Sequence, residues 1–382
     1  MKPMSVRGNR GFSLIEILVG VAIGLIGMSV MFRMVALWDT HTRTSTSGSD
    51  AQVAGSLAMF NLERDIRQAG MGFGLAKAPF MGCPVPAIDA VGPRPFQFFL
   101  YPVRIVPQAA GPDDIQVLYG NSSFFGDEQT FTASTATTKT LLRRGGFRPG
   151  DLAVVAGNEG AAPASAQCAL VEVTADTNPD KQTIDHAQGT YTSFYGGASG
   201  VARYNTAPAS APVFSAGRIY NLGPSPRFNV WHIGAGSVLT YSDPIHDPDT
   251  TFEVAEGVVN MKAQYGVDSN ADGRITSAAP DEWVTTTPVS WTQVLAVRVA
   301  ILVRSKQFER TADPSAATPL AVTTDAPAWA NGVPFVMTNA DGTPDSFSGA
   351  PNTSNPNNWR FYRYRVYERV IPLRNMIWGT SP

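Results

Sequence analysis

The stretch GNRGFSLIEILVGVAIGLIGM, residues 8–28, decides the fold of this chain. The apolar run continues from Phe12 to Trp38, and it carries Glu16 near its start and Arg33 near its end. As an α-helix it spans about 40 Å, which is enough to cross a bilayer. A carboxylate in a lipid-facing helix costs several kcal/mol. Glu16 therefore needs an explanation that a simple membrane anchor does not give.

The residues before this run are basic, because Lys2, Arg7 and Arg10 stand there without any acid. Such a leader keeps the N-terminus in the cytoplasm and places everything after Trp38 outside. A cleavable secretory signal is the first alternative, but it needs an uncharged core and a small-x-small cleavage site, and MFRMVALWD offers none. An ordinary signal anchor is the second alternative, and it leaves Glu16 unexplained.

The motif RGFSLIE, with its basic leader and the apolar helix behind it, resembles the processing motif of type IV prepilins. The resemblance implies that a prepilin peptidase removes residues 1–11 by cutting after Gly11 and then methylates Phe12. The new cationic amine on Phe12 is itself costly near lipid. Glu16, one helical turn along, neutralises that amine within the chain or in an adjacent subunit. The family implies the second arrangement, which sets the register of a subunit entering the fibre.

Three glycines follow in the same helix, Gly20, Gly24 and Gly27. Small residues at this spacing let two helices approach closely, so we predict a helix-packing face. Two alternatives stay open: the glycines mark points where the helix melts in a fibre, or they reflect the general frequency of glycine in membrane helices.

Helical periodicity resumes after a polar segment and ends at a glycine cluster that begins with Gly70. We therefore predict one helix over residues 12–69, bent or disordered near 40–50. Residues 12–38 form the membrane and fibre-core part, and 39–70 form an amphipathic continuation that packs on a sheet. The apolar positions are Ala51, Ala54, Ala58, Leu62, Ile66 and Ala69, and the predicted solvated face carries Glu63, Arg64, Asp65 and Arg67.

From residue 71 onward the chain consists of short β-like runs separated by turn residues, and it is rich in glycine (35) and proline (29). The predicted class is α+β and pilin-like: a long N-terminal helix on an antiparallel sheet, with one loop-rich, β-rich region over 71–382. The polar stretches 127–140, 176–216 and 309–357 are predicted as surface loops.

Cys83 and Cys168 are the only cysteines. Because the anchor exports both to an oxidising compartment, we predict that they form a disulfide. Closing a loop of this length stabilises the fold by roughly 4–5 kcal/mol in the chain-entropy model.

The loop YGVDSNADGRITSAAPDEW, residues 265–283, opens like a calcium-binding loop, with side-chain oxygens at alternate positions and a glycine at the sharp turn. The bidentate glutamate expected at position twelve is absent, and Asp281 or Glu282 is the substitute. We predict weak calcium binding; the alternative is a metal-free turn. The proposed ligands are Asp268, Asn270, Asp272, Arg274 through its carbonyl, and Asp281.

The segment LERDIRQAGMGFG, residues 62–74, resembles the end of the first helix in PilW-type minor pilins, and the blocks near 265–305 and 359–375 resemble the same family. The resemblance implies a minor pilin that initiates type IV pilus assembly at the fibre tip. Its implied partners are the prepilin peptidase, other minor pilins, the major pilin and a tip adhesin. Two alternatives stay open, a J-type pseudopilin of type II secretion and a calcium-dependent adhesin.

Other functions lack support in the sequence. The formal net charge is −2 and only 16% of the residues are charged, so nucleic acid is not an expected partner. The arginine- and tyrosine-rich block NWRFYRYRVYERVIPL is predicted as a half-buried strand. There is no P-loop, HExxH or GxSxG motif, and we predict that the chain is not an enzyme. The expected location is the inner membrane, with residues after the anchor in the periplasm, and then the pilus.

Overall fold

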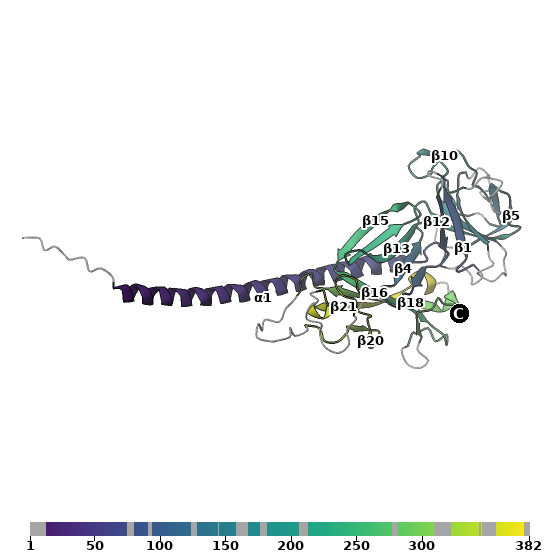
Figure 1. Ribbon diagram of the computed structural model, residues 1–382. Coiled ribbons are helices and arrows are strands. Elements are labelled where there is room, and N and C mark those ends of the chain that lie inside the picture. Colours follow the sequence, from purple (N-terminus) through teal and green to yellow (C-terminus); the bar gives the residue numbers. More distant parts are fainter. Residues whose placement is uncertain are drawn as a thin grey trace, which may run out of the picture.

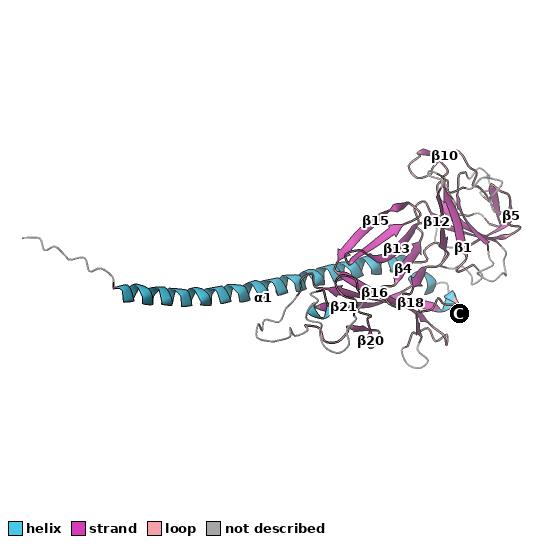
Figure 2. Ribbon diagram, in the orientation of Figure 1, coloured by secondary structure: helices cyan, strands magenta, loops and turns pink. Residues whose placement is uncertain are grey.

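The computed structural model describes residues 13–74, 80–90, 94–123, 128–143, 145–157, 167–175, 182–205, 213–276, 282–308, 322–343, 345 and 357–377. A single helix, α1 (Leu14–Gln68), projects far beyond a β-rich body, and only its last third is packed against that body (Figure 1). Figure 2 shows that strands dominate everything after this helix. The predicted α+β class is confirmed.

Helix α1 runs without interruption for 55 residues, about 80 Å. The predicted disorder near residues 40–50 is therefore wrong for the backbone: the helix continues through this polar segment and is only gently curved in Figure 1. Its end agrees with the prediction. Ala69 caps the helix, and Gly70 follows with φ +81°, a left-handed conformation that glycine adopts without strain.

Two sheets flank the end of the helix. The five-stranded sheet has the order β15-β14-β13-β4-β3, and the four-stranded sheet has the order β17-β16-β18-β21. The bounds in the first are β3 (Val103–Val106), β4 (Asp114–Tyr119), β13 (Arg227–Gly234), β14 (Val238–Asp243) and β15 (Asp247–Glu256). Those in the second are β16 (Val258–Val267), β17 (Trp283–Val284), β18 (Val294–Arg304) and β21 (Tyr364–Pro372).

A six-stranded sheet lies at the far end of the body, in the order β8-β7-β12-β5-β6-β9 (Figure 1). Every strand pairing in the described residues is antiparallel. The bounds in this sheet are β5 (Gln129–Ser134), β6 (Thr138–Leu141), β7 (Leu152–Gly157), β8 (Gln167–Glu172), β9 (Thr183–Asp185) and β12 (Gly217–Gly223).

The remaining elements are short. The hairpins are β1 (Pro84–Asp89) with β2 (Arg94–Phe99), β10 (Thr190–Thr192) with β11 (Ser199–Val201), and β19 (Ala328–Trp329) with β20 (Val333–Pro334). The helical turns are η1 (Trp291–Gln293), η2 (Trp359–Phe361) and α2 (Arg374–Ile377).

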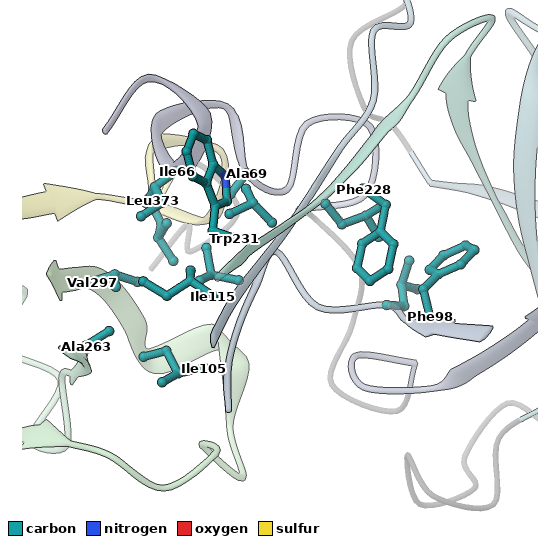
Figure 3. Close-up of a cluster of buried hydrophobic side chains, with 14 of the residues drawn as sticks. Ile66, Ala69, Phe98, Ile105, Ile115, Phe228, Trp231, Ala263, Val297 and Leu373 are labelled. Carbon is teal, nitrogen blue, oxygen red and sulfur yellow. The ribbon is translucent and has the colours of Figure 1, made fainter. Parts of the chain in front are cut away.

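One main core joins the helix to both flanking sheets. Ile66 of α1 and Ala69, the cap of that helix, lie beside Trp231 of β13 and Leu373, which follows β21 (Figure 3). Every residue of β7 is buried, because one face of the six-stranded sheet contributes to this core and the other covers a second cluster that includes Phe131 and Val155. The flanking sheets thus hold α1 by apolar burial.

The predicted loops at 127–140 and 176–216 contain strands. Residues 129–141 form the hairpin β5–β6, and β9, β10 and β11 lie in the second stretch. The third stretch, 309–357, holds β19 and β20. The composition was misleading because threonine favours strands, and single inward residues such as Phe131 and Leu141 are enough to seat the hairpin.

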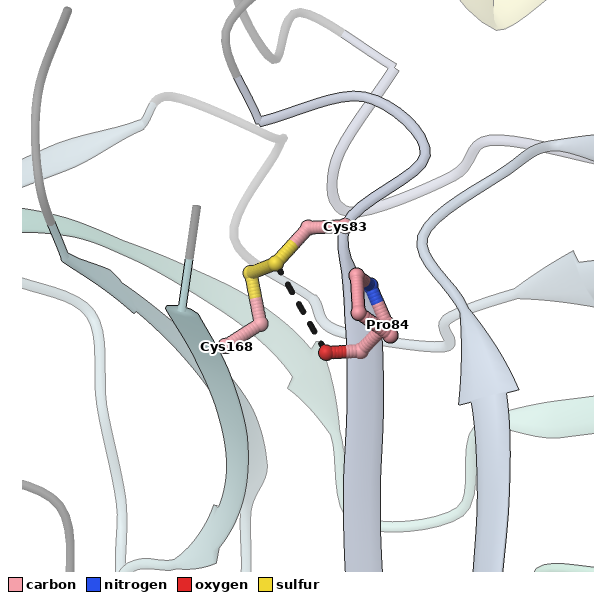
Figure 4. The surroundings of a disulfide bond; sticks show 3 residues. All are labelled: Cys83, Pro84 and Cys168. Atoms are coloured by element: carbon pink, nitrogen blue, oxygen red, sulfur yellow. Dashed lines mark hydrogen bonds between the residues drawn. A yellow bond between two sulfur atoms is a disulfide. The ribbon is translucent and has the colours of Figure 1, made fainter. Parts of the chain in front are cut away.

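The disulfide prediction is confirmed. Cys83, directly before β1, is bonded to Cys168 in β8 (Figure 4). The bond closes a sequence separation of 85 residues and attaches the β1–β2 hairpin to the six-stranded sheet.

Candidate assembly surface on helix α1

The first part of α1 is an apolar surface without any cover in the described chain. Leu14–Val35 is 22 residues long and apolar enough to cross a membrane. Every large apolar side chain in it is more than half exposed, from Leu14 at 79% to Val19 at 52%. Because exposed apolar surface of this extent is unfavourable in water, this segment requires lipid or another protein around it.

Glu16 lies in the first turn of α1. Ser13 caps the helix, and its backbone N–H donates to Oε2 of Glu16 at 3.4 Å. This geometry turns the carboxylate back toward the start of the helix. Glu16 accepts a hydrogen bond from the backbone N–H of Ser13. Phe12 is bonded directly to Ser13, so an amine created on Phe12 would lie one residue from that N–H group. Gly11 and Phe12 themselves lie outside the described residues.

The three anchor glycines face open space. A Cβ atom added at Gly20, Gly24 or Gly27 would meet nothing within 4 Å. Within the described residues, no packing requires glycine at these positions. Their role in packing against another helix stays a prediction.

The last third of α1 has two opposite faces. Ala58, Leu62 and Ile66 are fully buried against the body. On the other side, Val53 and Phe60 are 65% and 61% exposed, and Leu57 lies between them at helical spacing. The buried face explains why the helix ends in the body, whereas the exposed stripe is left uncovered by the described part of the chain.

Strand β21 holds the helix at very short range. The Tyr367 ring lies so close to Gly55 that a Cβ at residue 55 would overlap it. The Tyr367 hydroxyl donates to the Gln52 carbonyl at 3.1 Å. At the other end, the Asn375 side-chain amide donates to the carbonyls of Gln68 and Ala69, both at 3.0 Å. The two bonds from Asn375 satisfy carbonyls that the end of a helix leaves unpaired.

These contacts explain the role of the C-terminal arginine- and tyrosine-rich block and of the PLRN motif that overlaps its end. The prediction that the block forms a strand is confirmed for β21, which pairs with β18 along its whole length, whereas Trp359–Phe361 before it form the helical turn η2. The motif PLRN, residues 372–375, supplies the asparagine cap of α1. Sequence reasoning missed this role because the cap and the helix end are separated by 307 positions.

The prediction that Asp65 lies on a solvated face of the helix is wrong. Glu63 and Arg67 form the expected surface pair at 2.5 Å, but Asp65 is only 2% exposed. Its carboxylate accepts hydrogen bonds from the Asn229 amide at 2.6 Å and the Trp231 indole at 3.0 Å. Burial raises the pKa of Asp65, and these two hydrogen bonds act in the opposite direction. The residue therefore fixes α1 to β13.

In the predicted calcium loop, the side chains of Asp268 and Glu282 accept hydrogen bonds from the backbone of the loop itself. Asp268 is buried, and its two oxygens accept the N–H groups of Asp272 at 3.1 Å and Gly273 at 2.8 Å. Asp272 in turn accepts the N–H of Arg274 at 2.8 Å, and the side-chain oxygen of Asn270 accepts the backbone N–H of Asp272 at 3.0 Å.

Glu282 closes the other side of the loop. It accepts the N–H groups of Ser269 and Thr276 at 3.0 and 2.8 Å, and these backbone bonds hold its pKa below the usual range. Asp281 lies outside the described residues. Within the described part of the chain, no three His, Cys, Asp or Glu side chains gather as a metal site. Calcium binding here stays a prediction.

Two family models match the chain. Residues 238–375, from β14 to α2, match the model of the type IV pilus-assembly protein W, PilW. Residues 6–32, which hold the processing motif and the start of α1, match the model of the prokaryotic N-terminal methylation motif. Searches of curated proteins and of solved structures find no match.

Proposed function

We propose that this chain, a type IV pilin-like protein of the PilW type that acts in pilus assembly, is a minor pilin that helps initiate the fibre together with other minor pilins. In this proposal the prepilin peptidase cuts between Gly11 and Phe12 and methylates Phe12. The chain first waits in the inner membrane with its body in the periplasm, and it then occupies the fibre tip, where it meets the major pilin and a tip adhesin.

The observation that carries the proposal is the exposure of α1. The segment Leu14–Val35 has no cover in the described chain, while the end of the same helix is fixed in the body. A helix of this kind serves as a single membrane anchor and, after extraction, as a surface for neighbouring helices. The exposed stripe at Val53, Leu57 and Phe60 extends this surface beyond the membrane.

Glu16 supplies the chemistry of the transfer. Its carboxylate already turns toward Ser13, next to the position of the future amine on Phe12. Either charge alone is costly in lipid, and a pair in low dielectric is strongly attractive. A subunit leaving the bilayer would therefore favour the register in which its Glu16 meets the amine of a neighbour.

The test compares Glu16→Ala with Glu16→Asp in cells that assemble pili. We expect the alanine variant to be cut normally and to be absent from sheared pili, because processing precedes the pairing step. The shorter acid should restore part of the incorporation, whereas a loss caused by helix disruption would not recover. Normal incorporation of the alanine variant would contradict the proposed pair.

Deletion of the gene separates the pilus from the type II secretion alternative. The proposal expects a loss of piliation with normal secretion of exoproteins, and a J-type pseudopilin would give the opposite result. A calcium-dependent adhesin would instead leave piliation intact and remove surface binding.

A further inference from the structure

Two edge strands lie against the helix, one from each flanking sheet. Strand β15 is the last strand of the five-stranded sheet, and β21 is the last strand of the four-stranded sheet. Both contact α1. In Figure 1 they lie on opposite sides of the helix. An edge strand leaves one row of backbone groups without a partner strand, so its side chains determine what can approach it.

The edge formed by β15 is acidic. Asp247, Asp249, Glu253 and Glu256 are all exposed, and the strand carries no basic residue. Glu256 pairs with Lys306 at 3.1 Å. The other three carboxylates form no ion pair in the described part of the chain.

The edge formed by β21 is basic on the side that faces the helix. Arg365 and Arg369 alternate with Tyr367, which packs on α1, so the three share one face of the strand. Both arginines are exposed, and neither forms an ion pair with a described residue; Arg365 donates a hydrogen bond to the Gln52 side chain of α1 at 3.2 Å, and Arg369 has the more available charge. Glu368 lies on the other face, where Arg298 approaches it at 3.5 Å.

We propose that these two edges bind each other between copies: the β21 arginines of one molecule contact the β15 carboxylates of a second copy of this chain. The argument is the segregation of sign. Charges of either sign protect an edge strand from aggregation. Mixed charges on each edge would give the same protection. The β15 edge is instead wholly acidic, and the β21 edge is arginine-rich on the side that faces the helix. Segregation of this kind gives two complementary surfaces on one molecule.

The contact joins two different surfaces, so it is heterologous. It rests on the proposed function in one respect, because the α1 anchors must hold both copies in the same orientation in the membrane. Two copies side by side then present unlike edges to each other. The charges need only approach within several ångströms, and salt should weaken the contact.

The experiment is disulfide crosslinking between two differently tagged full-length copies in membranes. The chain's own cysteines, Cys83 and Cys168, are bonded to each other, so introduced cysteines are the only free thiols. One copy carries Thr251→Cys on β15 and the other carries Arg365→Cys on β21, which is exposed on the same face as Arg369 and leaves Arg369 for the charge test. Val289→Cys, 97% exposed and in the segment between β17 and η1, replaces Arg365→Cys as the control.

Charge reversal then tests the ion pairs. We expect a crosslink for the edge pair and none for the control. Glu253→Arg alone or Arg369→Glu alone should lower the yield by about tenfold, and the two together on opposite copies should restore it. The absence of a crosslink, a yield unaffected by reversal, or crosslinks to other proteins only would overturn the proposal. Cleavage after Gly11, read on the same gel, reports on the proposed function separately.

Discussion

Replacing Asp65 by alanine and by asparagine separates the hydrogen bonds of this side chain from its charge. In the alanine variant, the Trp231 indole N–H and the Asn229 amide lose their acceptor in a buried site. Each unsatisfied group costs about 1–3 kcal/mol, so we expect a loss of about 2–6 kcal/mol in the free energy of unfolding. At roughly 2 °C per kcal/mol for a body of this size, the melting temperature should fall by about 4–12 °C.

Asparagine should behave differently. Its carbonyl oxygen can accept both bonds, and its amide can donate to the Tyr119 hydroxyl, which now donates to Asp65 at 3.3 Å. Burial raises the pKa of Asp65 in the folded protein above its ordinary value of 3.8. The protonated form therefore contributes stability that is complete below the ordinary pKa. This contribution is lost as the pH rises through the raised pKa of the folded state. The asparagine variant lacks this loss. We expect it to match the wild type near pH 4 and to be at least as stable at pH 7.

Thermal unfolding of the full chain in detergent, followed by tryptophan fluorescence at several pH values, measures both variants. The reasoning is refuted if asparagine destabilises the protein at pH 7 as much as alanine does. That result would mean that an ionised carboxylate, rather than its hydrogen bonds, holds α1 to β13.

Three further predictions concern the helix contact, the disulfide and the loop. Gly55→Ala should destabilise the body by about 1–3 kcal/mol through overlap with Tyr367; limited proteolysis of α1 measures this, and Tyr367→Ala should relieve most of the added cost. Cys83→Ser should match Cys168→Ser and the double variant, each losing roughly 4–5 kcal/mol in unfolding experiments, and a smaller loss in one single variant would contradict a shared bond. Calcium should release heat in titration of the full chain and raise its melting temperature, and Asp268→Ala should abolish both. The absence of both heat and a thermal shift with the wild type rules out the site.

Local signals were enough to predict the helix and its processing motif. The end of α1 follows from the glycine at residue 70, and the amphipathic stripe follows from a spacing of three and four residues. The order of the sheets could not be predicted in this way. Strand β13 pairs with β4, which lies more than a hundred positions earlier. The local sequence of neither strand indicates which strand it pairs with. Pairing of this kind depends on burial of the whole body.

The two residues that sequence reasoning misread share one physical cause. Asp65 sits among charged neighbours on a helix, and Asn375 follows a strand near the C-terminus. Each acquires its role from a partner far away in the chain: Asp65 from β13, and Asn375 from the carbonyls that end α1. The local sequence of a polar residue that bonds to distant elements does not differ from that of one in water. Only the assembled sheets distinguish the two cases.

The position of Asp65 also determines where Glu16 points. The two residues lie 49 positions apart on one continuous helix, about 74 Å along its axis. A slip of one residue at the docked end would rotate the helix by about 100° and carry Glu16 to another side of the anchor. Apolar packing alone tolerates small rotations, whereas the bonds from Asn229 and Trp231 are directional. A buried carboxylate is a costly way to gain stability, but here it gives the helix one orientation, and that orientation extends to the end where assembly begins.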